Sequence, residues 1–224
     1  MRIDIMTLFP EMCNEVLKES IIGRAIKKEI IQIDCHNIRD FSENKHNRVD
    51  DYPYGGGKGM VMACAPIYNC FSAISKDCES KPRLIYMSPK GKTLTQEKAI
   101  ELSKLDRFVV LCGHYEGVDQ RVIDEIVDEE ISIGDYVLTG GELPALVLVD
   151  TVCRMIDGVL SDRECFTQES HFNQLLEHEQ YTRPEIWNGR RVPDVLLSGN
   201  HAQIKKWKEN NSVEVTKKMR PELI

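Results

Sequence analysis

Residues 131–144 have the sequence ISIGDYVLTGGELP, in which three glycines and a proline stand close together. Glycine has no Cβ, so a ligand can approach the backbone amides and carbonyls of such a segment closely. Pro144 suits the first turn of a helix, and the apolar run 145–149 follows at once. The stretch therefore predicts a strand, a glycine-rich turn with room for a ligand, and a helix. An ordinary strand, turn and helix of an α/β core fits the same residues.

The composition is ordinary for a soluble globular protein. The chain has 224 residues, of which 42% are hydrophobic and 29% charged, which is enough for one large domain with a small one beside it. The run 145–149 is far shorter than a membrane span, and the N-terminus lacks the apolar stretch of a signal peptide. The eight cysteines form no Cys-x-x-Cys pair and no zinc spacing. We therefore expect a cytoplasmic protein with reduced thiols, no metal site and no membrane partner.

Charge is distributed unevenly along the chain. The net charge of −7 argues mildly against binding to nucleic acid. Residues 183–224, however, carry nine Lys and Arg against five Asp and Glu, so this end is basic and the rest is acidic. A basic end on an acidic body can contact a phosphate backbone locally. A solvated basic face explains the same count.

Strands and helices alternate along the first two thirds of the chain. The patterns predict strands at 2–8, 30–38, 84–87, 108–112 and 131–133, and helices at 16–28, 66–75, 95–105 and 143–156. This order indicates an α/β fold, with an open, mostly parallel sheet and helices on both faces. Three strands end in glycine-bearing turns, 88–91, 113–117 and 134–141. Ligands bind outside the carboxyl ends of parallel strands, so we expect the turns to share one site.

Two nucleotide motifs are excluded by spacing. No G-x-G-x-x-G follows any predicted strand, so the dinucleotide fingerprint is absent. The long polar loop 42–54 ends in the glycine-rich segment 54–60, YGGGKGM. A Walker A loop needs a glycine and a Ser or Thr where Tyr52 and Gly59 stand.

The end of the chain predicts a separate small domain. Residues 158–170 are polar and irregular, and helices are expected at 204–208 and 211–224. We expect a first domain over 1–158 that binds the ligand, a linker over 159–170, and a small all-helical domain over 171–224.

Several motifs resemble one family, in that family's order and over nearly the whole chain. They are LFPE (8–11), NIRDF (37–41), DDYPYGGG (50–57), SP-x-G (88–91), LCG-x-YEG (111–117), IGDYVLTGGEL (133–143), YTRP (181–184) and VLLSGNHA (195–202). Together they resemble the bacterial tRNA (guanine-37-N1)-methyltransferases, which belong to the knotted SPOUT methyltransferase superfamily.

The resemblance implies a fold and an activity. The sheet of the first domain would be tied in a trefoil knot, a rare exception to unknotted topology. The methyl donor would be S-adenosylmethionine, the product S-adenosylhomocysteine, and the enzyme a homodimer. The substrate would be tRNA with a guanine next to the anticodon on its 3′ side, position 37, methylated on N1. Dependence on Mg²⁺ stays open.

The resemblance also assigns residues. Arg154 matches the catalytic arginine, and Glu169 stands where the family commonly has its aspartate base, with Asp162, Glu164 and His171 as alternatives. His114 replaces a usual arginine. The expected donor-binding residues are Tyr86, Ser88, Pro89, Gly91, Gly113, Tyr115, Glu116, Ile133, Gly134, Tyr136, Leu138, Gly140, Gly141 and Pro144. Asp50 and Gly59 match positions that face the anticodon bases, and the charge of the basic end adds Arg183, Arg190, Lys205, Lys206 and Lys208 as expected RNA contacts.

Guanine N1 bears a proton and lies on the pairing edge of the base. The base must therefore be turned into the site and deprotonated by a carboxylate, for which Glu169 is expected. Arg154 is expected to reach guanine O6 and N7 and to stabilise the charge that collects on O6. Two alternatives remain open: a knotted methyltransferase that acts on another RNA base, and a non-catalytic RNA-binding protein.

Overall fold

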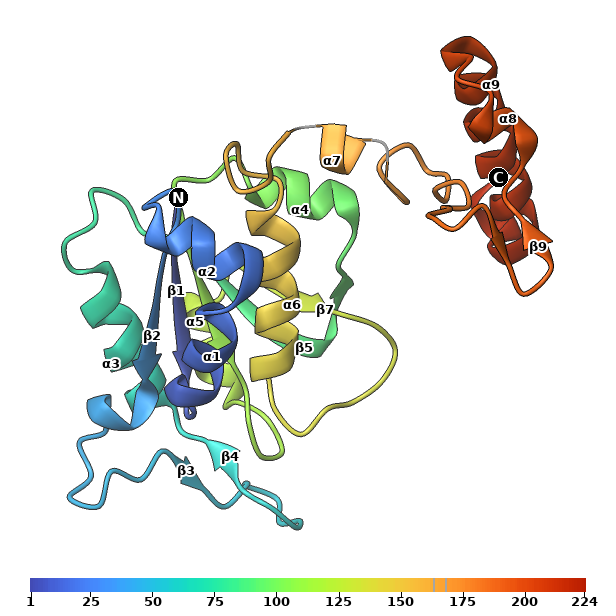
Figure 1. Ribbon diagram of the computed structural model, residues 1–224. Coiled ribbons are helices and arrows are strands. Elements are labelled where there is room, and N and C mark those ends of the chain that lie inside the picture. Colours follow the sequence, from blue (N-terminus) through green and yellow to red (C-terminus); the bar gives the residue numbers. More distant parts are fainter. Residues whose placement is uncertain (163, 168) are drawn as a thin grey trace. The chain divides into compact units, whose positions relative to one another are not determined.

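The chain folds as two compact units, Met1–Ser161 and Asp162–Ile224 (Figure 1). The computed structural model describes residues 1–162, 164–167 and 169–224, and gives only the backbone of residues 164 and 165.

The first unit is built on a five-stranded sheet with the order β2-β1-β6-β5-β7. Every neighbouring pair is parallel, with Ile3 opposite Phe108 and Tyr86 opposite Leu111. The expectation of an open parallel sheet is confirmed. The strands are β1 (Arg2–Thr7), β2 (Gln32–Asn37), β5 (Arg83–Thr93), β6 (Arg107–Cys112) and β7 (Glu129–Ser132).

Helices cover both faces of this sheet, as expected (Figure 1). Alternate strand residues point to opposite faces, and Met6, Tyr86 and Leu111 pack with α3 and α5 in one core cluster. On the other face α6 packs against β1 and β6, with α1 and α4 beside it. The helices of this unit are α1 (Pro10–Leu17), α2 (Ser20–Lys27), α3 (Cys64–Ser75), α4 (Gln96–Leu102), α5 (Gln120–Ile126) and α6 (Glu142–Cys153).

The helix expected over 16–28 is wrong in one respect, because the helix is interrupted within this range. Helix α1 ends at Leu17 and α2 begins at Ser20, whose φ of 53° does not fit a continuous helix. The turn between them lies against Gly23, where a Cβ would stand 2.0 Å from the carbonyl oxygen of Lys18.

Strand β5 also departs from expectation, because residues 88–91 do not end it. The strand continues to Thr93, and its pairing with β7 shifts so that Met87 and Lys92 both face Ile131. Residues 88–91 thus bulge around β7 before the strand resumes. At the crossing, a Cβ on Gly91 would stand 2.4 Å from the carbonyl carbon of Glu130, so glycine is required where the two backbones meet.

The long polar loop is anchored to the turn that follows β6. It begins after a 3₁₀ turn, η1 (Ile38–Phe41), and contains the antiparallel pair β3 (Asp50–Asp51) and β4 (Val61–Met62). The amide of Glu116 donates to the carbonyl of Met60 at 3.0 Å, and the amide of Met62 donates to the carbonyl of Gly117 at 2.9 Å. These bonds place the glycine-rich segment beside residues 113–117.

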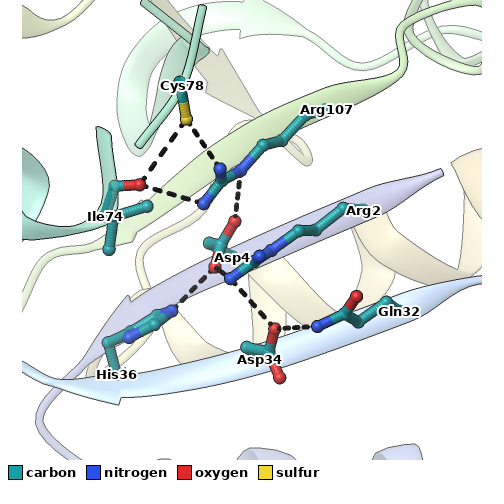
Figure 2. A network of polar contacts seen from close by, with 8 residues as sticks. All are labelled: Arg2, Asp4, Gln32, Asp34, His36, Ile74, Cys78 and Arg107. Carbon is teal, nitrogen blue, oxygen red and sulfur yellow. Dashed lines mark hydrogen bonds and ion pairs between the residues drawn. The ribbon is translucent and has the colours of Figure 1, made fainter. Parts of the chain in front are cut away.

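A polar network fixes the amino-terminal end of the sheet (Figure 2). Asp4 is fully buried, and its carboxylate lies 2.8 Å from Nε2 of His36, 2.8 Å from Nε of Arg107 and 3.1 Å from Nη2 of Arg2. Burial alone would raise the pKa of the Asp4 carboxyl, but these three partners outweigh it and hold the pKa below its ordinary value. The network joins β1, β2 and β6, and Nη2 of Arg107 also donates to the carbonyl of Ile74 in α3.

The second unit contains more than helices, which corrects the expectation of an all-helical domain. Residues 188 and 189 are Asn and Gly with positive φ, the signature of a two-residue hairpin turn, and they connect β8 to β9. A four-residue helix, α7, lies within the expected linker. The elements are α7 (Glu164–Thr167), β8 (Ile186–Trp187), β9 (Arg190–Arg191), α8 (Asp194–Leu197), α9 (His201–Met219) and the 3₁₀ turn η2 (Pro221–Leu223).

The two helices expected at 204–208 and 211–224 are one helix, α9. Its N-cap is Asn200, whose side chain accepts from the amide of Gln203 at 3.2 Å. The Asn-Asn-Ser run at 210–212 does not break the helix. Among the residues that the structure describes, no helix is both long and apolar enough to cross a bilayer.

Candidate active site

A cavity of about 200 Å³ opens at the carboxyl ends of β6 and β7 and beside the bulge of β5, and we call it the strand-end cavity. Its walls are residues 86–90, 113–118, 130–134 and 136–141, with Ile123 and Pro144. All three glycine-bearing segments therefore contribute to one cavity, as expected, although 88–91 is a bulge within β5 and not a turn that ends the strand.

Nearly every residue predicted to bind the donor lies in this wall. The exception is Gly91, which is required by the backbone crossing at β7. The predicted residues that line the cavity are Tyr86, Ser88, Pro89, Gly113, Tyr115, Glu116, Ile133, Gly134, Tyr136, Leu138, Gly140, Gly141 and Pro144.

The turn after β7 is held against the end of β6 by backbone contacts. The amide of Gly141 donates to the carbonyl of Gly113 at 2.8 Å. A Cβ on Gly141 would stand 2.7 Å from Cα of Cys112, and one on Gly113 would stand 2.8 Å from the hydroxyl of Tyr86. A side chain at either position would clash with the neighbouring wall of the cavity.

Ionisable groups gather around the same turn. Glu142 is buried in the first turn of α6 and accepts from Oγ1 of Thr7 at 2.8 Å. The His114 ring packs against Phe9, with centroids 5.2 Å apart, and its Nδ1 atom is buried and has no hydrogen-bond partner among the residues that the structure describes. Burial, and after it the charge of Glu130, raise the pKa of Tyr86 to about 12. The Tyr86 hydroxyl therefore stays protonated at neutral pH.

The glycine-rich loop forms part of the rim. Gly59 has a φ of 90°, and a Cβ there would stand 2.4 Å from Oε1 of Glu116, which lines the cavity. Asp50 is half-buried in β3, while Tyr54 is 98% exposed near the tip of the loop. The positions expected to face RNA bases thus border the cavity at Gly59.

The catalytic residues expected from the resemblance fall in different units. Arg154 is half-buried and caps the C-terminus of α6, the helix whose Pro144 lines the cavity. Glu169 and the alternatives Asp162 and His171 belong to the second unit. The side chain of Glu164 lies outside the described residues. The basic residues Arg183, Arg190, Lys205 and Lys206 are exposed in the second unit, and Lys208 is half-buried there.

Several residues of the cavity wall were not predicted as donor contacts, among them Val118, Ile123 and Glu130. Ile123 comes from α5, a helix that the sequence patterns did not reveal, and Glu130 directly precedes the glycine-rich stretch on β7. The alternation along β7 was the available signal for Glu130, because it places residues 130 and 132 on one face. No three His, Cys, Asp or Glu side chains among the described residues are placed to hold a metal ion.

Comparisons with known proteins agree over the full chain. Residues 1–224 match the family described as tRNA (Guanine-1)-methyltransferase TrmD. A Ruminiclostridium cellulolyticum protein named tRNA (guanine-N(1)-)-methyltransferase is 60% identical over 223 residues, which cover 100% of this chain and 96% of that protein. A protein of the same name from Alkaliphilus oremlandii is 56% identical over 229 residues, covering 100% of this chain and 92% of its own.

Proposed function

This chain belongs to the tRNA (Guanine-1)-methyltransferase family and methylates N1 of guanine in tRNA, and we propose that the donor is S-adenosylmethionine and the target guanine is position 37. The observation that carries the proposal is the strand-end cavity, which gathers all the expected donor residues except Gly91.

Two features of the cavity fit such a donor. Gly113 and Gly140 lie in the cavity wall, where the absence of a Cβ lets a nucleoside approach the backbone closely. Glu130 also offers a buried carboxylate oxygen that has no partner in the described protein. When bound, S-adenosylmethionine supplies an electrophilic methyl group on sulfur.

The protein's own residues deprotonate the guanine, stabilise the charge that develops on it and hold the tRNA. Glu169 takes the proton from guanine N1, which frees the nitrogen lone pair for attack. Arg154 donates to guanine O6, where negative charge collects as the proton leaves. Gly59 borders the site against Glu116, and Asp50 and Gly59 face the anticodon bases. The exposed cations of the second unit hold the phosphate backbone of the tRNA.

Assembly as a homodimer is supported by an apolar face on the first unit. Helices α1 and α6 lie side by side, and four of their apolar residues remain exposed in the single chain. They are Met12 (43% exposed), Val16 (53%), Leu143 (49%) and Val147 (45%). A second copy would cover this face and bring its own residues near Arg154 at the end of α6.

Two further parts of the proposal rest on the family and on the described cysteines. The family to which the chain belongs supports a sheet tied in a trefoil knot. The described cysteines are all free thiols, which fits a cytoplasmic enzyme. The first unit carries the donor site and the second docks the tRNA.

A methylation assay with two matched tRNA transcripts tests the activity. The transcripts differ only at position 37, which is guanine in one and adenine in the other. We expect transfer of one labelled methyl group to the guanine transcript alone. Equal labelling of both would show that another base is the target. Tight tRNA and donor binding without transfer would indicate a non-catalytic RNA-binding protein.

A further inference from the structure

Glu130 places a carboxylate beside the strand-end cavity that the mechanism above does not use. In the pairing of β5 with β7 it stands opposite Tyr86, so both side chains lie on the face covered by α3 and α5. The Oε2 atom of Glu130 is buried and has no hydrogen-bond partner among the described residues.

The surroundings make this missing partner unusual. Tyr86, Val118 and Ile123, which line the same cavity, are all buried members of the core cluster on that face. Buried polar atoms in folded proteins are almost always paired, and a charged oxygen left without a donor is costly. The adjacent Glu129 shows the contrast, because its carboxylate pairs with Nζ of Lys98 at 2.9 Å.

We propose that Glu130 is a specificity-determining residue of the donor site, whose carboxylate accepts an N–H or O–H hydrogen bond from the bound methyl donor. This inference rests on the proposed function, because it assumes that the strand-end cavity holds S-adenosylmethionine. That molecule offers two groups of suitable chemistry, the hydroxyls and amine of its adenosyl part and the ammonium of its amino-acid part. Either can donate a hydrogen bond to the Glu130 carboxylate.

Calorimetric titration of wild type, Glu130→Gln and Glu129→Gln is the test. Glutamine keeps the size of the side chain and removes its charge, so S-adenosylmethionine should bind Glu130→Gln roughly 10- to 100-fold more weakly. Glu129→Gln removes the same charge from the next residue and should bind like wild type. Titration with adenosine separates the two sources. Its affinity falls by the same factor if Glu130 contacts the adenosyl part, and is unchanged if Glu130 contacts the ammonium.

Thermal unfolding separates this role from a structural one. Without ligand, Glu130→Gln should unfold at or above the wild-type temperature, because an unpaired charge has been removed. With saturating S-adenosylmethionine, its gain in unfolding temperature should be smaller than that of wild type. A lower unfolding temperature with unchanged affinity would overturn the inference and leave water as the partner of Oε2. If wild type itself bound no S-adenosylmethionine, the proposed function would fall with it.

Discussion

Gly140 and Gly141 are adjacent in the sequence and are glycine for different reasons. A Cβ on Gly141 would meet backbone, with Cα of Cys112 at 2.7 Å and the amide nitrogen of Gly113 at 2.8 Å. One on Gly140 would meet only side-chain ends, Oε2 of Glu142 at 2.4 Å and Nδ1 of His114 at 2.7 Å. Side-chain ends can rotate away, whereas the end of β6 cannot.

Alanine at each position should therefore have a different effect. Gly141→Ala should lower the free energy of unfolding by about 1–3 kcal/mol, as overpacking does. Gly140→Ala should keep most of the stability but bind S-adenosylmethionine more weakly, because the displaced side chains enter the cavity. Denaturant unfolding and calorimetric titration of both variants measure the two effects. Equal stability of the two variants would contradict the distinction.

Glu169 is the residue whose role depends most on the family pattern. General-base catalysis supplies on the order of 10²–10⁴ in rate, so Glu169→Gln should slow methyl transfer by about that factor. Donor affinity should not change, since the base does not hold the donor, and Glu169→Asp should keep part of the activity. Single-turnover methylation at several pH values measures it. A wild-type rate for Glu169→Gln would pass the role to another group, and His171→Ala would then be the next variant.

The Asp4 network joins three strands and α3, so its loss should lower the stability of the whole sheet (Figure 2). Asp4→Asn leaves Arg107 and Arg2 without their buried counter-charge and should cost about 3–5 kcal/mol in free energy of unfolding at pH 7. Asp34→Asn is the control, because Asp34 is partly exposed and its pair with Arg2 is worth less than about 1 kcal/mol.

The same carboxylate should shape stability in acid. The pKa of Asp4 in the folded protein lies below its ordinary value of 3.8. Its contribution is therefore complete above pH 3.8 and is lost as the pH falls through the lower folded value. Urea unfolding of wild type between pH 5 and the acid limit should show this loss, and Asp4→Asn should show a flatter decline. Parallel curves for the two proteins would contradict the assignment.

The exposed face of α1 and α6 yields a prediction about assembly. Val147→Glu places a charge in the middle of this apolar face and should convert a wild-type dimer into a monomer at micromolar concentration. Leu197→Glu is the matched control, because Leu197 is equally exposed but lies in the second unit. Sedimentation of the three proteins decides the matter. A stable, active wild-type monomer would remove the dimer from the proposal.

Local patterns predicted most of these elements, and tertiary contacts explain the exceptions. The apolar strands and α3, α4 and α6 follow from alternation, helical spacing and the Thr95 cap. Helix α5 was missed because its short sequence is half charged and polar, and only Val122, Ile123 and Ile126 are buried. The continuation of β5 was hidden because SPKGK contains turn residues, and only pairing with β7 keeps it in the sheet. The cavity was predicted from strand ends, whereas Glu130 needed the cross-strand register.

Charge is divided along the molecule as a whole, because residues 183–224 carry nine Lys and Arg against five Asp and Glu while the rest of the chain is acidic. Lys205 and Lys206 are exposed on α9, so replacing both with alanine should weaken tRNA binding and flatten its salt dependence by about two units of slope. Lys217→Ala with Lys218→Ala removes equal charge from the far end of α9 and serves as the control. Binding measured at 50 and 200 mM salt tests this. Equal losses for both pairs would show a general charge effect instead of specific phosphate contacts.

The parallel order of the sheet also has a consequence for the nascent chain during its synthesis. Strand β1 ends at Thr7, but β6, its partner on one side, begins only at Arg107. At about 5–20 residues per second, the nascent chain waits on the order of 5–20 s between the two. Throughout that time the strand that carries Ile3, Ile5 and Met6, all buried in the finished protein, has at least one open hydrogen-bonding edge. The greatest risk of aggregation therefore arises during synthesis, before β6 pairs with β1.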